Sequence, residues 1–133
     1  MIINYIKNTS SVTAASLITQ IYGSADTSKA LYPDQIIQVA NSYGLSPIFT
    51  SSRISAVTVQ AQINLSKPLY IDMLKSDAVS RHAFCLTGYS ISGATYTIWN
   101  PWKSYFETLP TSNHIYVDDD GHTWIWARTI YAW

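Results

Sequence analysis

The sequence contains a single cysteine, Cys85, so no disulfide can form within the chain. Charged residues are also scarce: they make up 12% of the 133 residues, against about 25% in an average soluble domain. Eight basic and eight acidic residues give a formal net charge of zero. No basic patch is present, so we expect no nucleic-acid partner. The lack of net charge weakens the repulsion between copies, which predicts a tendency to self-associate.

Long apolar runs are missing too. No segment reaches the roughly 20 consecutive apolar residues that cross a membrane as a helix, so we expect no membrane span. The short acidic run 118–121 (DDDG) is not followed by the glutamate that ends a calcium loop, and Asp-Gly predicts a hairpin turn instead. His114 and His122 lack metal-ligand spacing; we expect both in loops, with His122 facing water. We therefore expect no metal and no cofactor.

Two apolar runs, residues 81–89 (RHAFCLTGY) and 94–100 (ATYTIWN), are separated by a Ser-Gly pair. Their aromatic and β-branched residues predict two strands joined as a hairpin at the glycine, with alternating anchors that include Ile91. In such a hairpin, His82 and Asn100, which are 18 positions apart, lie side by side at one end of a sheet.

An asparagine oxygen that binds one imidazole nitrogen fixes the ring and leaves the other nitrogen to act as a base. This is how a cysteine hydrolase prepares its histidine. A buried histidine that is only hydrogen-bonded within an ordinary sheet gives the same sequence pattern. On His82 and Asn100 alone, both interpretations stay open.

The motifs around this pair resemble the C-terminal half of papain-like cysteine peptidases, in particular the staphopain-type and double-glycine-leader-peptidase-like branches. His82 with the apolar run after it, and Trp99–Trp102 (WNPW), carry the resemblance. Weaker likenesses extend it over most of the chain, at residues 32–45, 67–71 (KPLYI) and 123–131.

The resemblance implies a papain-like α+β fold, with N-terminal helices followed by an antiparallel sheet. It implies peptide-bond hydrolysis on a peptide or protein substrate, with His82 as the general base and Asn100 as the residue that orients it. Trp102 matches the family's indole that shields the histidine–asparagine bond from water. It also points to a bacterial protein, and the abundant tyrosine and tryptophan suit an extracellular domain.

The nucleophilic cysteine of that family stands at the start of the first long helix, and residues 1–6 (MIINYI) resemble the middle of that helix. The resemblance therefore implies one domain over residues 1–133, cut short at its N-terminus, with the nucleophile upstream of Met1. Cys85 is not expected to replace it. On a strand it faces away from His82 and stands about 10 Å along the chain. We expect the chain by itself to be inactive.

The first half of the sequence predicts four helices and one short strand. Ser10 or Ser11 is expected to cap the second helix and Gly23 to end it. The expected elements are a helix at residues 2–6, a helix ending before Gly23, a helix from Pro33 that ends before Gly44, a strand at 46–50, and a helix capped by Ser55 with Val57, Val59, Ile63 and Leu65 inward. Strands and turns are predicted from residue 69 to the end, which gives an α+β order.

Three functions follow from this pattern. The first is a cysteine peptidase domain whose nucleophile lies outside the chain. The second is a catalytically inactive relative that keeps the groove and binds peptide. The third is a structural or interaction domain, which would be favoured if His82 and Asn100 were too far apart to bond.

Overall fold

Helices come first along the chain and strands afterwards, in the α+β order that the sequence predicts. The computed structural model describes residues 2–26 and 28–133. The chain divides into two units, the first ending at Phe49 but including Ala132–Trp133, and the second covering Thr50–Tyr131. The elements are α1 (Ile2–Lys7), α2 (Ala14–Tyr22), α3 (Pro33–Ser42), β1 (Ile48–Thr50), α4 (Ala56–Asn64), β2 (Leu69–Lys75), β3 (Arg81–Tyr89), β4 (Thr95–Asn100), β5 (Tyr105–Pro110), β6 (Ile115–Val117) and β7 (Thr123–Tyr131).

Local capping chemistry sets the ends of helix α2. The side chain of Thr13 accepts a hydrogen bond from the Ser16 N–H, and the Ser16 hydroxyl accepts one from the Thr13 N–H. The prediction that Ser10 or Ser11 caps this helix is therefore wrong, because the helix begins at Ala14 and Thr13, the residue before it, forms this reciprocal pair with Ser16. Gly23 ends the helix as predicted, in the left-handed conformation with φ 74°.

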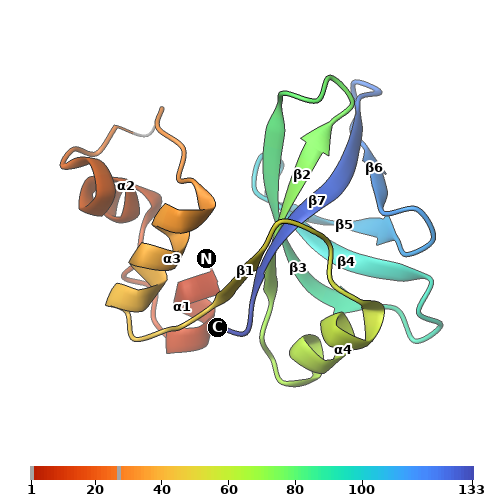
Figure 1. The fold of residues 1–133 in the computed structure, drawn as a ribbon, viewed down its shortest axis with the longest axis horizontal. Coiled ribbons are helices and arrows are strands. Elements are labelled where there is room, and N and C mark those ends of the chain that lie inside the picture. The colour runs from red at the N-terminus through yellow and green to blue at the C-terminus, as the bar shows by residue number, and fades with distance from the viewer. Residues whose placement is uncertain (1, 27) are drawn as a thin grey trace. The chain divides into compact units, whose positions relative to one another are not determined.

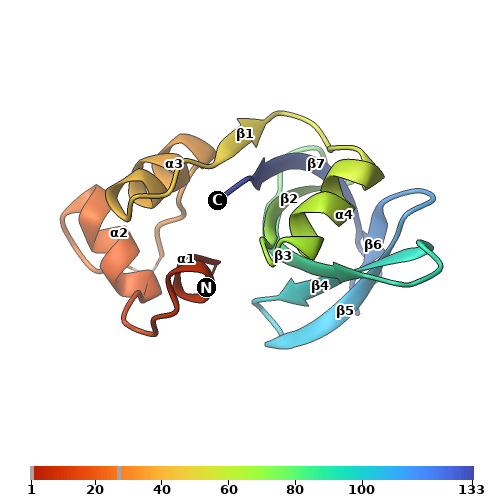
Figure 2. The same cartoon turned by 90° about the horizontal axis from the view of Figure 1, so that it is seen from below.

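Helix α4 lies in the second unit and packs on the sheet beside β3 (Figure 2). Ser55 caps it, as predicted, and Val59 and Ile63 face the hydrophobic core. The expectation that Val57 and Leu65 also point inward is wrong, since both are exposed. Residues two positions apart lie on nearly opposite sides of a helix, so Val57 and Val59 cannot share one face.

The strands that the structure describes form one sheet in the order β1-β7-β2-β3-β4-β5, with β6 paired to β7 (Figure 1). Each neighbouring pair from β2 to β7 is antiparallel. The buried face of this sheet supplies most of the core of the second unit. Its fully buried side chains include Leu69, Ile71, Met73, Phe84, Leu86, Tyr96, Ile98, Leu109 and Trp126.

Strands β3 and β4 form the predicted hairpin. Cys85 is opposite Trp99 and Tyr89 is opposite Tyr96, with one irregularity near Gly88. The turn closes at Gly93, which has φ 72° and donates its N–H to a carbonyl three residues earlier. This register brings the start of β3 next to the end of β4.

None of the helices in the described part of the chain has the length and apolar character that a membrane span needs.

One detail of the hairpin differs from expectation. Ile91 was expected to anchor a strand, but β3 ends at Tyr89 and Ile91 is fully exposed in the turn. The Ser-Gly pair therefore marks the centre of a turn that begins earlier than the hydrophobic pattern suggested.

The hairpin offers a matched pair of isoleucines for testing the core. Ile98 is 0% exposed in β4, whereas Ile91 is 106% exposed in the turn. We expect Ile98→Ala to lower the free energy of unfolding by about 2–5 kcal/mol through lost burial and a cavity. Ile91→Ala should change it by less than about 0.5 kcal/mol. Urea unfolding of both variants measures the difference, and similar losses would contradict this packing.

Candidate active site

His82 and Asn100 meet at one end of the β3–β4 hairpin. His82 is the second residue of β3 and Asn100 the last of β4. The Nε2 atom of His82 lies 3.1 Å from the Oδ1 atom of Asn100. His82 is 6% exposed and Asn100 is 1% exposed. The hydrogen bond that the sequence predicts is therefore present and buried.

The partners of Asn100 fix which end of its carboxamide faces the histidine. Its Oδ1 accepts a hydrogen bond from the backbone N–H of Trp102 at 3.0 Å, and its Nδ2 donates to Oε2 of Glu107 at 2.8 Å. An amide oxygen only accepts, so Nε2 of His82 must carry the hydrogen of their shared bond. When the ring is neutral, its lone pair then resides on Nδ1, which is the nitrogen that can accept a proton.

Three aromatic rings surround the imidazole. The indole of Trp102 stacks on it, with ring centroids 3.3 Å apart and planes inclined by 14°. Phe84 and Trp124 present their rings edge-on, at centroid distances of 4.4 Å and 6.0 Å. Trp102 is itself 65% exposed, so it covers one face of His82 from the solvent side. The ring is thus held in a largely apolar setting.

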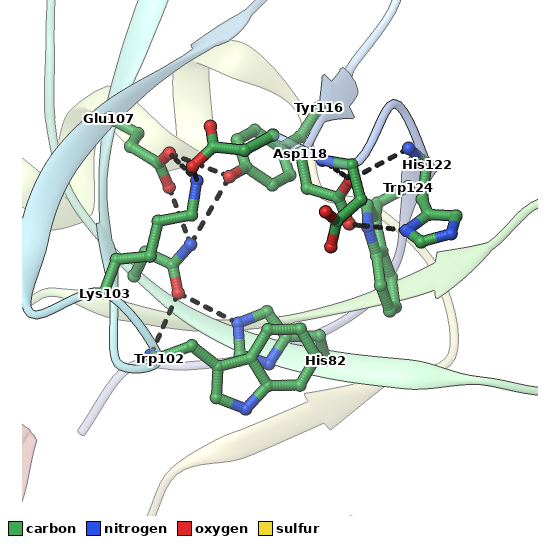
Figure 3. A network of polar contacts seen from close by, with 11 residues as sticks. His82, Trp102, Lys103, Glu107, Tyr116, Asp118, His122 and Trp124 are labelled. Carbon is green, nitrogen blue, oxygen red and sulfur yellow. Dashed lines mark hydrogen bonds and ion pairs between the residues drawn. The ribbon is translucent and has the colours of Figure 1, made fainter.

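A group of polar side chains lies behind Asn100, and the sequence pattern did not predict it. Glu107 accepts hydrogen bonds from Asn100 and from the hydroxyl of Tyr116, and Lys103 lies 3.4 Å from one of its oxygens (Figure 3). Lys103 also pairs with Asp119 at 2.7 Å. One sequence signal was available. Glu107 is the only glutamate in the chain, and it follows the Asn-Pro-Trp motif by a few residues.

The acidic run after β6 forms a turn, as predicted. Asp118 accepts hydrogen bonds from the His122 backbone N–H and, at 2.9 Å, from Nε1 of Trp124 (Figure 3). Burial opposes ionisation, but the hydrogen bonds from Trp124 and His122 hold the pKa of Asp118 at about 2. His122 is exposed, as expected. This loop therefore braces Trp124, one of the rings around the imidazole.

Ligand atoms of Asp118, Asp120 and His122 lie within 4.8 Å of one another. Carboxylate and imidazole groups are suitable ligands for a divalent ion. The carboxylate of Asp118 is already engaged by Trp124 and His122, and the other two groups are exposed. We assign no ion to this group, and the expectation of a metal-free protein stays a prediction.

Cys85 is not placed as a nucleophile. Along β3, His82, Phe84 and Leu86 are buried, whereas the residues between them, Cys85 included, are only partly buried. This alternation puts the thiol on the face opposite to the imidazole. Burial raises the pKa of Cys85 to about 12, so the thiol stays protonated at neutral pH. Cys85 therefore points away from His82 and carries a protonated thiol, so it is not a nucleophile paired with this histidine.

The comparison with known families supports the resemblance noted in the sequence. Residues 1–119 match the Peptidase_C39 like family. The chain belongs to this family. Its helices followed by an antiparallel sheet are the papain-like arrangement of that group of cysteine peptidases, and membership implies a peptide substrate. No curated protein sequence matches the chain.

The protonation of His82 in this Peptidase_C39-like chain reflects opposing effects. Burial lowers the pKa of the imidazole below its usual 6.5, whereas the hydrogen bond to Asn100 and the negative charge of Glu107 raise it. The net direction is downward. The ring is therefore predominantly neutral at pH 7, with a lone pair on Nδ1. Among the other histidines, His114 also has a lowered pKa, from burial and from Arg53, which lies 2.7 Å away.

These shifts predict a loss of stability in mild acid. In the unfolded chain both histidines take up a proton as the pH falls through about 6.5, whereas in the folded chain His82 and His114 take it up only at lower pH. The free energy of unfolding should therefore be constant between about pH 7.5 and pH 8 and fall toward about pH 5.5. Urea unfolding across this range measures it. His114→Gln should reduce the slope, and a stability that rises on acidification would contradict the shifts.

The position of Cys85 predicts its lack of reactivity. We expect no adduct when the folded chain is treated with an irreversible thiol-directed peptidase inhibitor, because the thiol is protonated and turned away from His82. Mass spectrometry detects the adduct. The same reagent in concentrated urea is the positive control, since unfolding exposes the thiol. Rapid labelling of the folded chain that disappears in His82→Ala would overturn this assignment.

Proposed function

We propose that this chain carries the histidine–asparagine half of a papain-like cysteine peptidase site, and that it hydrolyses peptide bonds together with a thiolate that Cys85 does not supply. The observation that carries the proposal is the buried His82–Asn100 hydrogen bond, in a chain that belongs to a cysteine peptidase family. The expectation of a single papain-like domain over residues 1–133 belongs to this proposal.

In the proposed reaction, Nδ1 of His82 takes the proton of the attacking thiol, which gives a thiolate and an imidazolium. The thiolate adds to the carbonyl carbon of the scissile peptide bond. The imidazolium then donates its proton to the leaving amine, and an acyl-enzyme remains. Water, deprotonated by the same nitrogen, hydrolyses this intermediate. Asn100 keeps the ring in place throughout, and Trp102 covers it.

A second candidate is a peptidase relative that binds peptide without cutting it. The placement of Cys85 favours this alternative, because the one thiol in the sequence lies on the wrong face of β3 and has a pKa of about 12. The two residues are hydrogen-bonded, so the wide separation that would have favoured a purely structural domain is absent. The same bond would also form in a domain where it only holds the hairpin together, and membership of a cysteine peptidase family is what favours the peptidase.

Cleavage of a quenched fluorescent peptide library by the product of the complete gene tests the proposal. We expect hydrolysis that a thiol-directed inhibitor abolishes. His82→Ala should lower kcat/KM by roughly 10²–10⁴, the usual contribution of a general acid–base. Asn100→Ala should cause a smaller loss, because the ring remains but is no longer oriented. The 133-residue chain alone should show no hydrolysis.

The matched control is Cys85→Ser, which should retain full activity because this thiol takes no part. Peptide binding without hydrolysis in the complete gene product would establish the second candidate. Activity that survives His82→Ala but not Cys85→Ser would contradict both the proposed base and the excluded thiol.

A further inference from the structure

Glu107 lies at the centre of the polar cluster behind the His82–Asn100 pair. It comes from β5, opposite Ile98 of β4, and its side chain is largely buried. Its Oε2 accepts from Asn100 at 2.8 Å, and its Oε1 accepts from the hydroxyl of Tyr116 at 2.8 Å. Burial, together with the hydrogen bond to Glu107, raises the pKa of Tyr116 to about 12, so this hydroxyl stays protonated and donates. Both oxygens are engaged, which restrains rotation of the carboxylate.

This arrangement discriminates between the two orientations of the Asn100 carboxamide. The oxygen and nitrogen ends of an amide have nearly the same shape, so only their partners select one. A flipped Asn100 would point its oxygen at Oε2 of Glu107, so two acceptor oxygens would face each other without a hydrogen between them. It would also point its NH₂ at the backbone N–H of Trp102. Two hydrogen bonds would become two repulsive contacts.

The position of the Glu107 carboxylate is not explained by a need to neutralise the charge of Lys103. Lys103 has a closer carboxylate in Asp119, at 2.7 Å against 3.4 Å to Glu107. That contact with Asp119 is the main reason why the pKa of Lys103 is raised. The shorter contacts of Glu107 are instead with Asn100 and Tyr116 (Figure 3).

We infer that Glu107 is a positioning residue for His82: it holds the oxygen of Asn100 toward the imidazole, which keeps the ring proton on Nε2 and the lone pair on Nδ1. The negative charge of Glu107 also stabilises the protonated ring. Its Coulombic attraction raises the pKa of His82, against the lowering effect of burial. A role of this arrangement in catalysis rests on the proposed function, in which Nδ1 exchanges the proton with the thiol. The positioning of His82 by Glu107 does not depend on that function.

Histidine NMR tests the inference on the 133-residue chain. Long-range ¹H–¹⁵N correlation spectra report which ring nitrogen carries the proton, and His82→Gln identifies the signals of His82 among the three histidines. In the wild type we expect the Nε2–H tautomer. Glu107→Leu removes the acceptor for Asn100 at similar volume, and we expect both tautomers to be populated. Glu107→Gln keeps an accepting oxygen but removes the charge, so we expect the Nε2–H tautomer with a lower pKa for His82.

Asp119→Asn is the matched control, since it removes a carboxylate from the same cluster without touching Asn100. It should leave the tautomer unchanged and lower the pKa of His82 less than Glu107→Gln does. A tautomer and a pKa in Glu107→Leu equal to those of the wild type would overturn the inference. If that variant does not fold, Glu107→Gln decides, and a shift no larger than that of Asp119→Asn overturns it.

These spectra need no peptidase activity, so the two proposals fail separately. An unchanged His82 in the Glu107 variants removes the positioning role and leaves the proposed function intact. Absence of peptide hydrolysis in the complete gene product removes the proposed function, while the tautomer result would still describe how this chain holds its histidine.

Discussion

The antiparallel pairing of β3 with β4 determines where the side chains of His82 and Asn100 lie. Cys85 opposite Trp99 fixes the register, and this register brings His82 from the start of one strand beside Asn100 at the end of the other. A slip by one residue would turn every side chain of β3 to the opposite face of the sheet. His82 would then leave its partner, and Phe84 and Leu86 would leave the core. The packing of the core and the hydrogen bond of the site therefore stabilise the same register.

Burial of a polar pair is favourable only when its hydrogen-bonding groups are satisfied. Asn100 is nearly inaccessible to water, yet its oxygen has two donors and its nitrogen has a carboxylate acceptor. The rings of Trp102 and Phe84 close around His82 and exclude solvent, which strengthens each of these bonds. The same exclusion lowers the pKa of the imidazole, so the site holds a neutral base without a direct ionic partner.

Much of this arrangement could be predicted from the sequence because it depends on local patterns. Alternating residues and a Ser-Gly pair were sufficient to predict the hairpin, and the hairpin was sufficient to predict the His82–Asn100 bond. The same alternation placed Cys85 on the other face. The helix α4 prediction failed for Val57 because two valines two residues apart were both assigned to the core.

Glu107 could not be found in this way. Its role arises from the pairing of β4 with β5 and from the approach of Tyr116 on β6, and neither follows from spacing along the chain. A charged residue in an edge strand, such as Glu107 between Phe106 and Thr108, is usually solvated. Only the three-dimensional register brings its carboxylate to the back of Asn100.

An amide between a histidine and a carboxylate has a different effect from direct contact. In a serine protease triad, the carboxylate bonds to the imidazole itself and stabilises the imidazolium strongly. Here Asn100 is interposed, so Glu107 orients the pair through its hydrogen bond while its charge acts on His82 from a greater distance. In the proposed reaction His82 accepts a proton from a thiol, which is more acidic than a serine hydroxyl. A histidine that is held in one orientation and is neutral at pH 7 can accept that proton.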